Sequence, residues 1–381
     1  MDFSPTEEQK MIREMVREFS LGELSPTAEA TDRDRTFPKK HVEKMAELGL
    51  MGVCVPEEYG GAGMDTVCYA IAVEELAAGC ASTSLVMAVN NSLACGPIND
   101  WGTDEQKKKW LKPLASGKKL GCFALTEANA GSDAANLSTT AELKGDHYVI
   151  NGSKLFISNA AEADITIAFA ITDKTVDKHK GITAFVVDMK AKGVTVGKHE
   201  RKLGMHGCST CEISFDNVEV PKENMLGKLG QGFKVAMKTL DGGRISIAAQ
   251  AVGLAHSAFH RAVNFAKERV QFGKPIATKQ AIQWMIADMA VAVRSARWLT
   301  YHAAWLKDRG EPCNREAAMA KVRSAEAANF VCNKSVQIHG GYGYTEEYDV
   351  ERMLRDARIT EIYEGTSEIQ RLVIATSYIR G

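Results

Sequence analysis

A glutamate near the end of the chain, Glu364, has the neighbours expected of a catalytic base. It stands between Tyr363 and Gly365, and Thr366 can cap a helix that begins directly after it. Glu368 would then lie in the first turn of that helix, where the helix dipole favours a carboxylate. Glu364 is therefore expected on a connector, and connectors often carry catalytic side chains. From the residues alone it is either a solvated loop charge or a placed base.

Two earlier segments could approach a flat polar ligand. Residues 126–133 form a loop of small and hydroxyl residues, whose backbone could come close to such a ligand. Residues 154–160 contain one aromatic ring, Phe156, and one hydroxyl, Ser158, which could hydrogen-bond a ring nitrogen. Taken singly, the first segment could be a simple turn and the second an ordinary arm of a hairpin.

Three segments combine arginine or glycine with predicted helix ends. Asp241 and Arg244 flank two glycines where a long helix is predicted to begin, and arginine suits phosphate or a stacked base. Residues 269–275 and 337–344 each end a predicted helix with glycines. A surface charge at a helix start and ordinary glycine caps are the plain alternatives.

Two other patterns indicate no metal or dinucleotide site. Cys208 and Cys211 form a single CxxC pair, and no second pair stands at a spacing suited to zinc. Residues 340–343 are rich in glycine but follow a predicted helix rather than a strand, unlike a dinucleotide-binding fingerprint. We therefore expect no metal.

Residues 362–371 resemble the C-terminal signature of the acyl-CoA dehydrogenases. The segments described above resemble other motifs of that family in the same order, so the resemblance covers essentially the whole chain. The chain departs from many members at Ala128 and Asn129, where they carry a proline and a variable residue. It also has Phe156 and Ser158 where many members carry tryptophan and threonine.

The resemblance implies α,β-dehydrogenation of an acyl-CoA by FAD, with Glu364 as the base. Some relatives place their base at the position that matches Gly243, and glycine cannot serve, so Glu364 is the only matching candidate. The backbone N–H at the base and a flavin hydroxyl would stabilise charge on the thioester oxygen. Electrons would pass to an electron-transfer flavoprotein.

The resemblance also implies which residues hold the ligands. The expected cofactor-binding residues are Phe123, Leu125, Thr126, Gly131, Ser132, Phe156, Ile157, Ser158, Arg269, Phe272, Gln280, Gln337, Gly340, Gly341, Thr366 and Glu368. The expected substrate-binding residues are Ser132, Asp241, Arg244 and Gly365. In the family, the positions that match Arg269, Gln280 and residues 337–341 contact the flavin of a neighbouring subunit, which implies a homo-oligomer, usually a tetramer.

The subgroup resembled is the short-chain, butyryl-CoA type. Residues 89–93, 121–125 and 316–321 all look like that subgroup, and Ser84 stands where glutaryl-CoA dehydrogenases carry an arginine for a second carboxylate. A branched or alicyclic short acyl group stays open, as does an acyl-CoA oxidase that reacts with oxygen. A non-enzymatic CoA-binding assembly protein is disfavoured by Glu364, Arg269 and both flavin segments.

Helices are expected to position the first part of the chain. Residues 4–7 read as a helix start with Ser4 as the cap, and apolar residues then follow helical spacing. Further helices are predicted over 39–47, 66–78, 82–95 and 103–115. We therefore predict an N-terminal helical domain over residues 1–120.

A β domain and a second helical domain are expected to follow. Asn151-Gly152 between two β-prone runs predicts a hairpin, and more strands fit 164–172, 182–188, 194–198 and 211–220. Long alanine-rich helices are predicted over 248–270, 280–306 and 315–339. The predicted fold class is α+β: helices over 1–120, a small β-barrel-like domain over 121–230 and a four-helix bundle over 231–381.

Composition excludes several other classes of protein. The chain has 381 residues, of which 45% are hydrophobic and 25% charged, with a net charge of −1. The balance of charge argues against a nucleic-acid partner, and no apolar run is long enough to span a membrane. Nine scattered cysteines and an acidic start without a leader pattern predict a reducing compartment. A bacterial cytoplasm fits best, with a processed mitochondrial matrix protein as the alternative.

Overall fold

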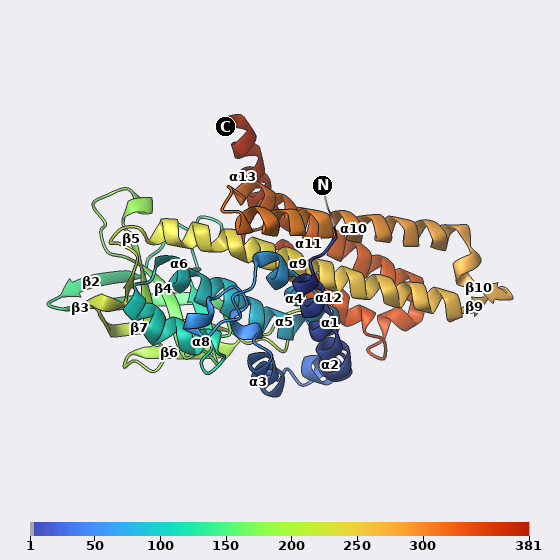
Figure 1. Cartoon of the computed structure of the whole chain (residues 1–381), viewed down its shortest axis with the longest axis horizontal. Coiled ribbons are helices and arrows are strands. Elements are labelled where there is room, and N and C mark those ends of the chain that lie inside the picture. Colours follow the sequence, from blue (N-terminus) through green and yellow to red (C-terminus); the bar gives the residue numbers. More distant parts are fainter. Residues whose placement is uncertain (1–3, 381) are drawn as a thin grey trace.

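The computed structural model describes residues 4–380, and its elements form a helical layer, a β-sheet and a set of long helices (Figure 1). The sheet lies at one end of the molecule, and the long helices extend from it to the other end. The predicted domain bounds fall in the connections after Ala115 and after Leu226, and they remain a proposal.

Helices make up the first 115 residues, as the spacing predicts. α4 is mostly apolar, with Glu74 and Glu75 as its two charged residues, and it is buried nearly throughout because α1, α5 and the long helix α9 surround it. The helices are α1 Glu7–Phe19, α2 Ser25–Arg33, α3 Lys39–Glu47, α4 Thr66–Gly79, α5 Ala81–Ala88, α6 Gly96–Trp101, α7 Asp104–Gln106 and α8 Lys112–Ala115. The predicted cap of the first helix is wrong by two residues: Thr6 is the cap, because Gln9 completes a capping box with it.

The sheet has eight strands in the order β6-β7-β3-β2-β4-β5-β8, with β1 beside β4. The strands are β1 Gly121–Ala124, β2 Thr140–Lys144, β3 His147–Ser158, β4 Ile165–Ile171, β5 Ile182–Asp188, β6 Val194–His199, β7 Thr210–Pro221 and β8 Met225–Leu226. The hairpin predicted at Asn151-Gly152 is wrong. β3 runs through both residues with a bulge against β7, because Gly152 packs against Thr139, and the turn lies at residues 145–146 instead.

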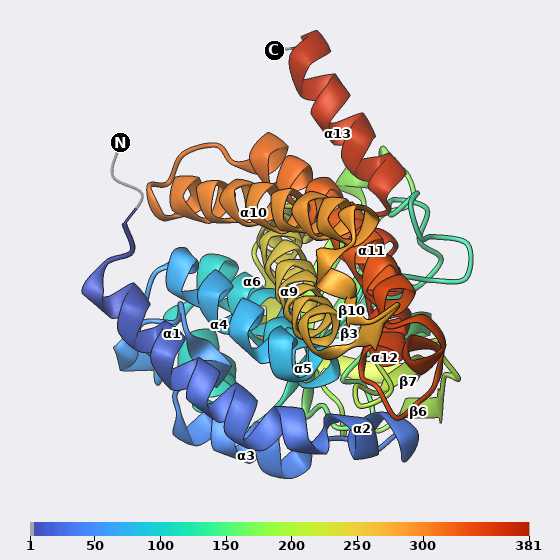
Figure 2. The same cartoon turned by 90° about the vertical axis from the view of Figure 1, so that its right-hand side faces the viewer.

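Three long helices form the C-terminal part: α9 Gly232–Glu268, α10 Gln280–Asp308 and α11 Asn314–His339, followed by α12 Val350–Arg358 and α13 Ser367–Arg380. α9, α10 and α11 pack on one another, while α13 contacts α11 and projects from the body (Figure 2). α9 begins well before the predicted start. Asp241 and Arg244 therefore lie inside the helix and not at its beginning, because Gly242 and Gly243 are tolerated in a buried helix.

Within residues 4–380, none of the helices is long and apolar enough to cross a lipid bilayer. All nine cysteines of the chain are free thiols.

Candidate active site

Glu364 lies on a short connector between α12 and α13, as predicted. Its backbone and that of Gly365 are both left-handed, with φ of 55° and 90°. Such a conformation is uncommon for a residue with a side chain and is often found at functional sites. Thr366 caps α13 through its Oγ1, which accepts a hydrogen bond of 3.3 Å from the Ile369 N–H, so that predicted cap is confirmed.

Two side chains hold the connector in this conformation. The Gln370 amide donates hydrogen bonds to the backbone oxygens of Glu364 and Gly365, at 3.0 and 2.9 Å. Lys321 on α11 donates from Nζ to the Gly365 oxygen at 2.8 Å. Lys321 is fully buried, with 0% exposure. A lysine is rarely buried in this way unless its ammonium group has a partner, and here the Gly365 oxygen is that partner. The sequence analysis does not predict this role of Lys321, since nothing distinguishes a buried lysine in an alanine-rich helix from an exposed one.

The carboxylate of Glu364 points toward α9. Its Oε2 is buried and has no hydrogen-bond partner within residues 4–380. A Cβ atom added to Gly243 would lie 2.2 Å from that oxygen, so glycine leaves the space that the carboxylate occupies. Burial raises the pKa of Glu364 to about 7, while the charges of Arg244 and Lys321 act in the opposite direction. The carboxylate can therefore gain or lose a proton near neutral pH.

Arg244 is brought to this site from α9, one turn beyond Asp241. It is only 4% exposed, so it is not the surface charge that the plain alternative assumed. Its guanidinium lies 2.8 Å from Asp241 Oδ1, which also accepts a 2.6 Å hydrogen bond from Asn314. Arg244 Nε is buried and has no partner in the described part of the chain, so it can donate to a ligand.

Tyr363, beside the base, ties the connector to two other helices. Its hydroxyl donates to Gln250 Oε1 on α9, and the Gln250 amide donates to the Ala81 oxygen at 2.9 Å. The connector is therefore fixed from α9, α11 and α13 together, and a catalytic side chain needs such support to stay in position.

The two predicted flavin segments lie side by side. The Leu155 N–H donates to the Thr126 oxygen at 2.8 Å, which joins the 126–133 loop to β3. Phe156 is 64% exposed with a left-handed φ of 58°, while Gly131 and Ser132 are exposed on the loop. The side chains of Leu125 and Ile157 are buried in the protein interior, so only their backbones could contact a ligand.

A buried ion pair that the sequence did not reveal supports this loop. Lys154 Nζ lies 2.7 Å from Glu127 Oε1, and both side chains are almost fully buried. Glu127 also accepts hydrogen bonds from Ser138 and from the Thr139 N–H. Burial opposes ionisation, but the charge of Lys154 and these hydrogen bonds lower the pKa of Glu127 to about 2.

Two predicted cofactor residues, Thr366 and Glu368, lie at the start of α13 beside the Glu364 connector, whereas six others lie at the other end of the molecule. Arg269, Gly340 and Gly341 line a cavity of about 590 Å³ with Tyr342, whose ring lies 5.2 Å from the Arg269 guanidinium carbon. Phe272 nearby is 93% exposed, and Gln280 and Gln337 lie at adjoining helix ends. Arg269 follows Gly243 by 26 residues on α9, which is ~39 Å along a helix. One chain therefore does not bring these residues to Glu364.

Within residues 4–380, no group of three or more His, Cys, Asp or Glu side chains is arranged to hold a metal ion. Cys208 and Cys211 are buried thiols, and burial raises the pKa of Cys208 to about 12.

Comparison with known proteins shows matches over nearly the whole chain. Residues 6–118, 122–218 and 230–379 match the family models for the N-terminal, middle and C-terminal domains of acyl-CoA dehydrogenase. The short-chain specific acyl-CoA dehydrogenase of Clostridium acetobutylicum is 52% identical over 380 residues and covers 100% of both chains.

Two solved structures share the fold over their full length. Butyryl-CoA dehydrogenase from Megasphaera elsdenii is 45% identical, with a TM-score of 0.98 and full coverage of both chains. A chain in a structure from work on the electron transferring flavoprotein of Acidaminococcus fermentans is 49% identical, with a TM-score of 0.99 and full coverage.

Proposed function

The chain belongs to the acyl-CoA dehydrogenase family, and from that membership we propose that it oxidises a short-chain acyl-CoA to the trans-2-enoyl-CoA with Glu364 as the base. The observation that carries this assignment is the buried Glu364 carboxylate, packed against Gly243 and near two cations, with a pKa of about 7. A base needs a pKa near the working pH in order to be both ionised and proton-accepting.

The residues around the two flavin segments fit FAD. Phe156 offers an exposed ring, Ser158 a hydroxyl and the 126–133 loop its backbone, and the Leu155 N–H hydrogen bond to the Thr126 oxygen joins the loop to β3. The cavity at the far end offers the Arg269 guanidinium and two glycines, Gly340 and Gly341, at which an added Cβ would meet nothing within 4 Å. A guanidinium beside open backbone suits a pyrophosphate.

In the proposed reaction, Glu364 removes the α-proton of the acyl group. The backbone N–H of Glu364 donates to the thioester oxygen, where negative charge develops, and Gln370 and Lys321 keep that N–H in place. Arg244 and Asp241 bind the CoA portion of the substrate. The chemistry that bound FAD supplies is acceptance of the β-hydrogen as hydride. Electrons then leave the protein to an electron-transfer flavoprotein, a partner supported by the similar chain from the Acidaminococcus structure.

We also propose that the site is shared between two copies of the chain. Arg269, Gln280 and residues 337–341 lie too far from Glu364 to serve the same site within one chain. The outer face of α10 carries exposed large apolar side chains at intervals of seven residues: Trp284, Val291, Trp298 and Trp305. Such a stripe on a helix is typical of a surface that packs against another subunit. A homotetramer would satisfy both observations.

The acyl group is proposed to be short and uncharged at its far end. Ser84 is fully buried and donates its hydroxyl to the Val73 oxygen at 3.0 Å, so it supplies no charge for a second carboxylate. Butyryl-CoA is the first substrate to test. The nine free thiols favour a reducing compartment such as a bacterial cytoplasm.

An anaerobic visible spectrum of the purified protein, before and after butyryl-CoA, tests this proposal. Bleaching of a flavin band is the expected result. An unchanged band would direct the search to branched or alicyclic acyl groups. A protein that stays colourless after incubation with FAD would contradict the assignment. Rapid peroxide formation in air would identify an acyl-CoA oxidase instead.

A further inference from the structure

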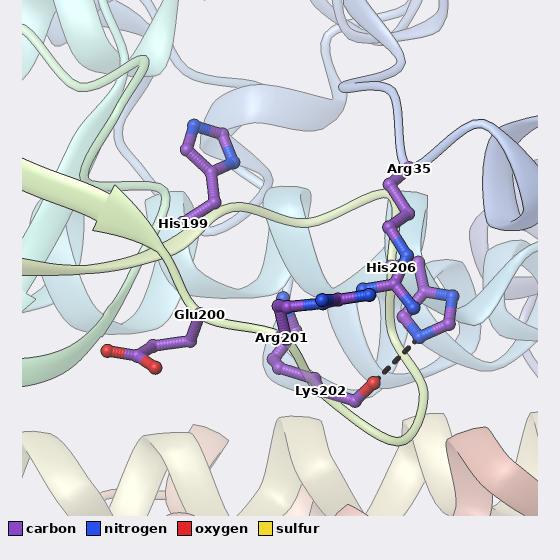
Figure 3. Close-up of a pocket in the computed structure, with 6 residues that line it drawn as sticks. All are labelled: Arg35, His199, Glu200, Arg201, Lys202 and His206. Carbon is purple, nitrogen blue, oxygen red and sulfur yellow. Dashed lines mark hydrogen bonds between the residues drawn. The ribbon is translucent and has the colours of Figure 1, made fainter.

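A small basic pocket lies between the N-terminal helices and the loop that joins β6 to β7. Its volume is about 180 Å³, and it is lined by Arg35, His199, Glu200, Arg201, Lys202 and His206 (Figure 3). We call these six residues the basic pocket. It is separate from the Glu364 connector and from the cavity at Arg269, since it shares no residue with either.

The two arginines of the basic pocket have no protein partner. Neither the Arg35 nor the Arg201 guanidinium forms a hydrogen bond or ion pair within residues 4–380, whereas nearby Arg33 pairs with Glu29 and Asp34. Figure 3 shows the Arg201 side chain directed toward Arg35 and His206, although like charges repel. Arg35 and Arg201 are both exposed and both line the same pocket, so their unpaired guanidinium groups are accessible to one anion.

The acidic groups around the pocket are already engaged or turned away. Asp32 pairs with His206 at 2.9 Å and with Arg355 at 2.7 Å. Glu162 accepts a hydrogen bond from the Ser209 hydroxyl. Glu200 points away from Arg201 and Arg35 in Figure 3. None of these carboxylates neutralises the two arginines, so the pocket keeps its positive charge.

The pocket is also preformed. Lys202 Nζ donates to the Cys208 oxygen at 2.9 Å, and His206 Nε2 donates to the Lys202 oxygen at 2.9 Å. The Met205 N–H donates to the buried Asp356, which fixes the same loop from α12. Arg35 has a left-handed backbone with φ of 52° just beyond the end of α2, where the Thr36 N–H donates to the Thr31 oxygen and fixes the turn that carries Arg35.

We propose that the basic pocket binds a phosphate group, either as inorganic phosphate or as the phosphate of a small phosphomonoester. A guanidinium fork matches phosphate oxygens, and two forks from separate segments can bind two edges of one tetrahedral anion. A phosphate dianion would neutralise Arg35 and Arg201 together. The volume admits a phosphate with a small substituent but not a nucleotide. The proposal does not rest on the dehydrogenase reaction, so binding can be measured without substrate.

Isothermal titration of the purified protein with inorganic phosphate tests the proposal, with ionic strength held constant by chloride. We expect saturable binding at one site per chain. Arg201→Gln and Arg35→Gly should each weaken binding by about tenfold or more, because each removes one charged fork. Glycine suits the left-handed backbone at position 35, so that variant should keep its fold. The matched control is Arg33→Gln, an exposed arginine two residues away that is already paired, and its affinity should stay within about twofold of the wild type.

The source of the phosphate follows from a second titration, with glycerol 3-phosphate. Tighter binding than inorganic phosphate would assign a phosphomonoester, and equal binding would assign the free anion. The absence of saturable binding up to about 10 mM of either ligand would overturn the proposal, since that limit corresponds to a very weak site. Equal affinities in Arg201→Gln, Arg35→Gly and Arg33→Gln would overturn it too, because binding would then lie elsewhere.

Discussion

At the scale of single residues, the proposed chemistry depends on the Glu364 carboxylate, whose pKa burial raises and two cations lower. Glu364→Gln keeps the shape of the side chain but cannot accept a proton. We expect kcat to fall by about 10²- to 10⁴-fold, the usual contribution of a positioned base, while the flavin band and substrate binding remain. Stopped-flow reduction of the flavin by butyryl-CoA measures this. The control is Glu361→Gln, a carboxylate three residues earlier that pairs with Arg358. Unchanged reduction in Glu364→Gln would exclude Glu364 as the base.

Lys321 adds a prediction about pH dependence. Because the ionised form of Glu364 is the active one, kcat/KM should rise with pH through about 7. The charge of Lys321 lowers the pKa of Glu364, so Lys321→Met should raise that pKa and move the rise to higher pH, by roughly half to one unit.

The comparison of pH profiles separates this effect from simple loosening of the connector. Lys321→Met also removes the hydrogen bond to the Gly365 oxygen, so kcat should fall as well. A lower kcat without a shift of the pH profile would limit Lys321 to a structural role. Lys334→Met, on the same helix, is the control, since Lys334 lies over the Phe330 ring and not beside Glu364.

At the scale of elements, the approach of α9 to the connector sets the position of the base. A Cβ at Gly243 would lie 2.2 Å from Glu364 Oε2, so Gly243→Ala should push the carboxylate aside. A displacement of about 1 Å can reduce the rate by about 10²-fold. Alanine favours the helix, so the variant should remain folded.

Gly242→Ala is the matched control for this substitution. Its Cβ would meet only the flexible end of Lys307, at 2.8 Å, and should leave the rate nearly unchanged. Steady-state kinetics with butyryl-CoA compares the two variants. Equal activities would show that the contact between Gly243 and Glu364 does not govern the reaction.

The helices and strands also show which features of the fold can be predicted from the sequence and which cannot. Helical spacing identified α3 with its bounds and most of α10 and α11, because apolar periodicity is a local property. The Asn-Gly turn signal failed at Asn151-Gly152, because pairing with β7 and packing on Thr139 decide that backbone. Neither pattern gave a sign of the Glu127–Lys154 pair, since two residues 27 positions apart are joined only by the fold.

That pair carries a prediction about stability. Lys154→Met leaves the buried Glu127 carboxylate without its counter-charge, and loss of one partner of such a pair costs about 3–5 kcal/mol. Glu127 has a folded-state pKa of about 2, below its ordinary value, so the stability it contributes is present above pH 4.5 and is lost as the pH falls toward 2. The thermal midpoint of Lys154→Met should therefore be lowered at pH 7, and the deficit should shrink at lower pH.

A double variant provides the control for this prediction. Glu127→Gln combined with Lys154→Met removes both charges, so it should recover part of the lost stability. A double variant no more stable than Lys154→Met alone would show that the loss arises from packing and not from the unpaired carboxylate.

At the scale of the whole molecule, most of the predicted cofactor residues form two groups that one chain keeps apart. One group lies at β3 and the 126–133 loop, near the sheet, and the other lies at the far end of α9 and α11 (Figure 1). The resemblance assigned both groups to one cofactor, and under that proposal the separation along α9 requires a second copy of the chain. The exposed stripe on α10 offers a surface through which they could pack.

A mixed oligomer tests this shared site. Glu364→Gln and Arg269→Gln should each be inactive alone, the first without a base and the second with weakened cofactor binding. When both variants are co-expressed, a hybrid pair of subunits combines the intact Glu364 of one copy with the intact Arg269 of the other. Random mixing of a symmetric pair would then restore about a quarter of the wild-type sites. Activity of tag-purified hybrids, compared with the two variants purified separately and mixed without exchange, measures the restoration. If each site drew both residues from the same chain, every hybrid site would carry a defect and no activity would return.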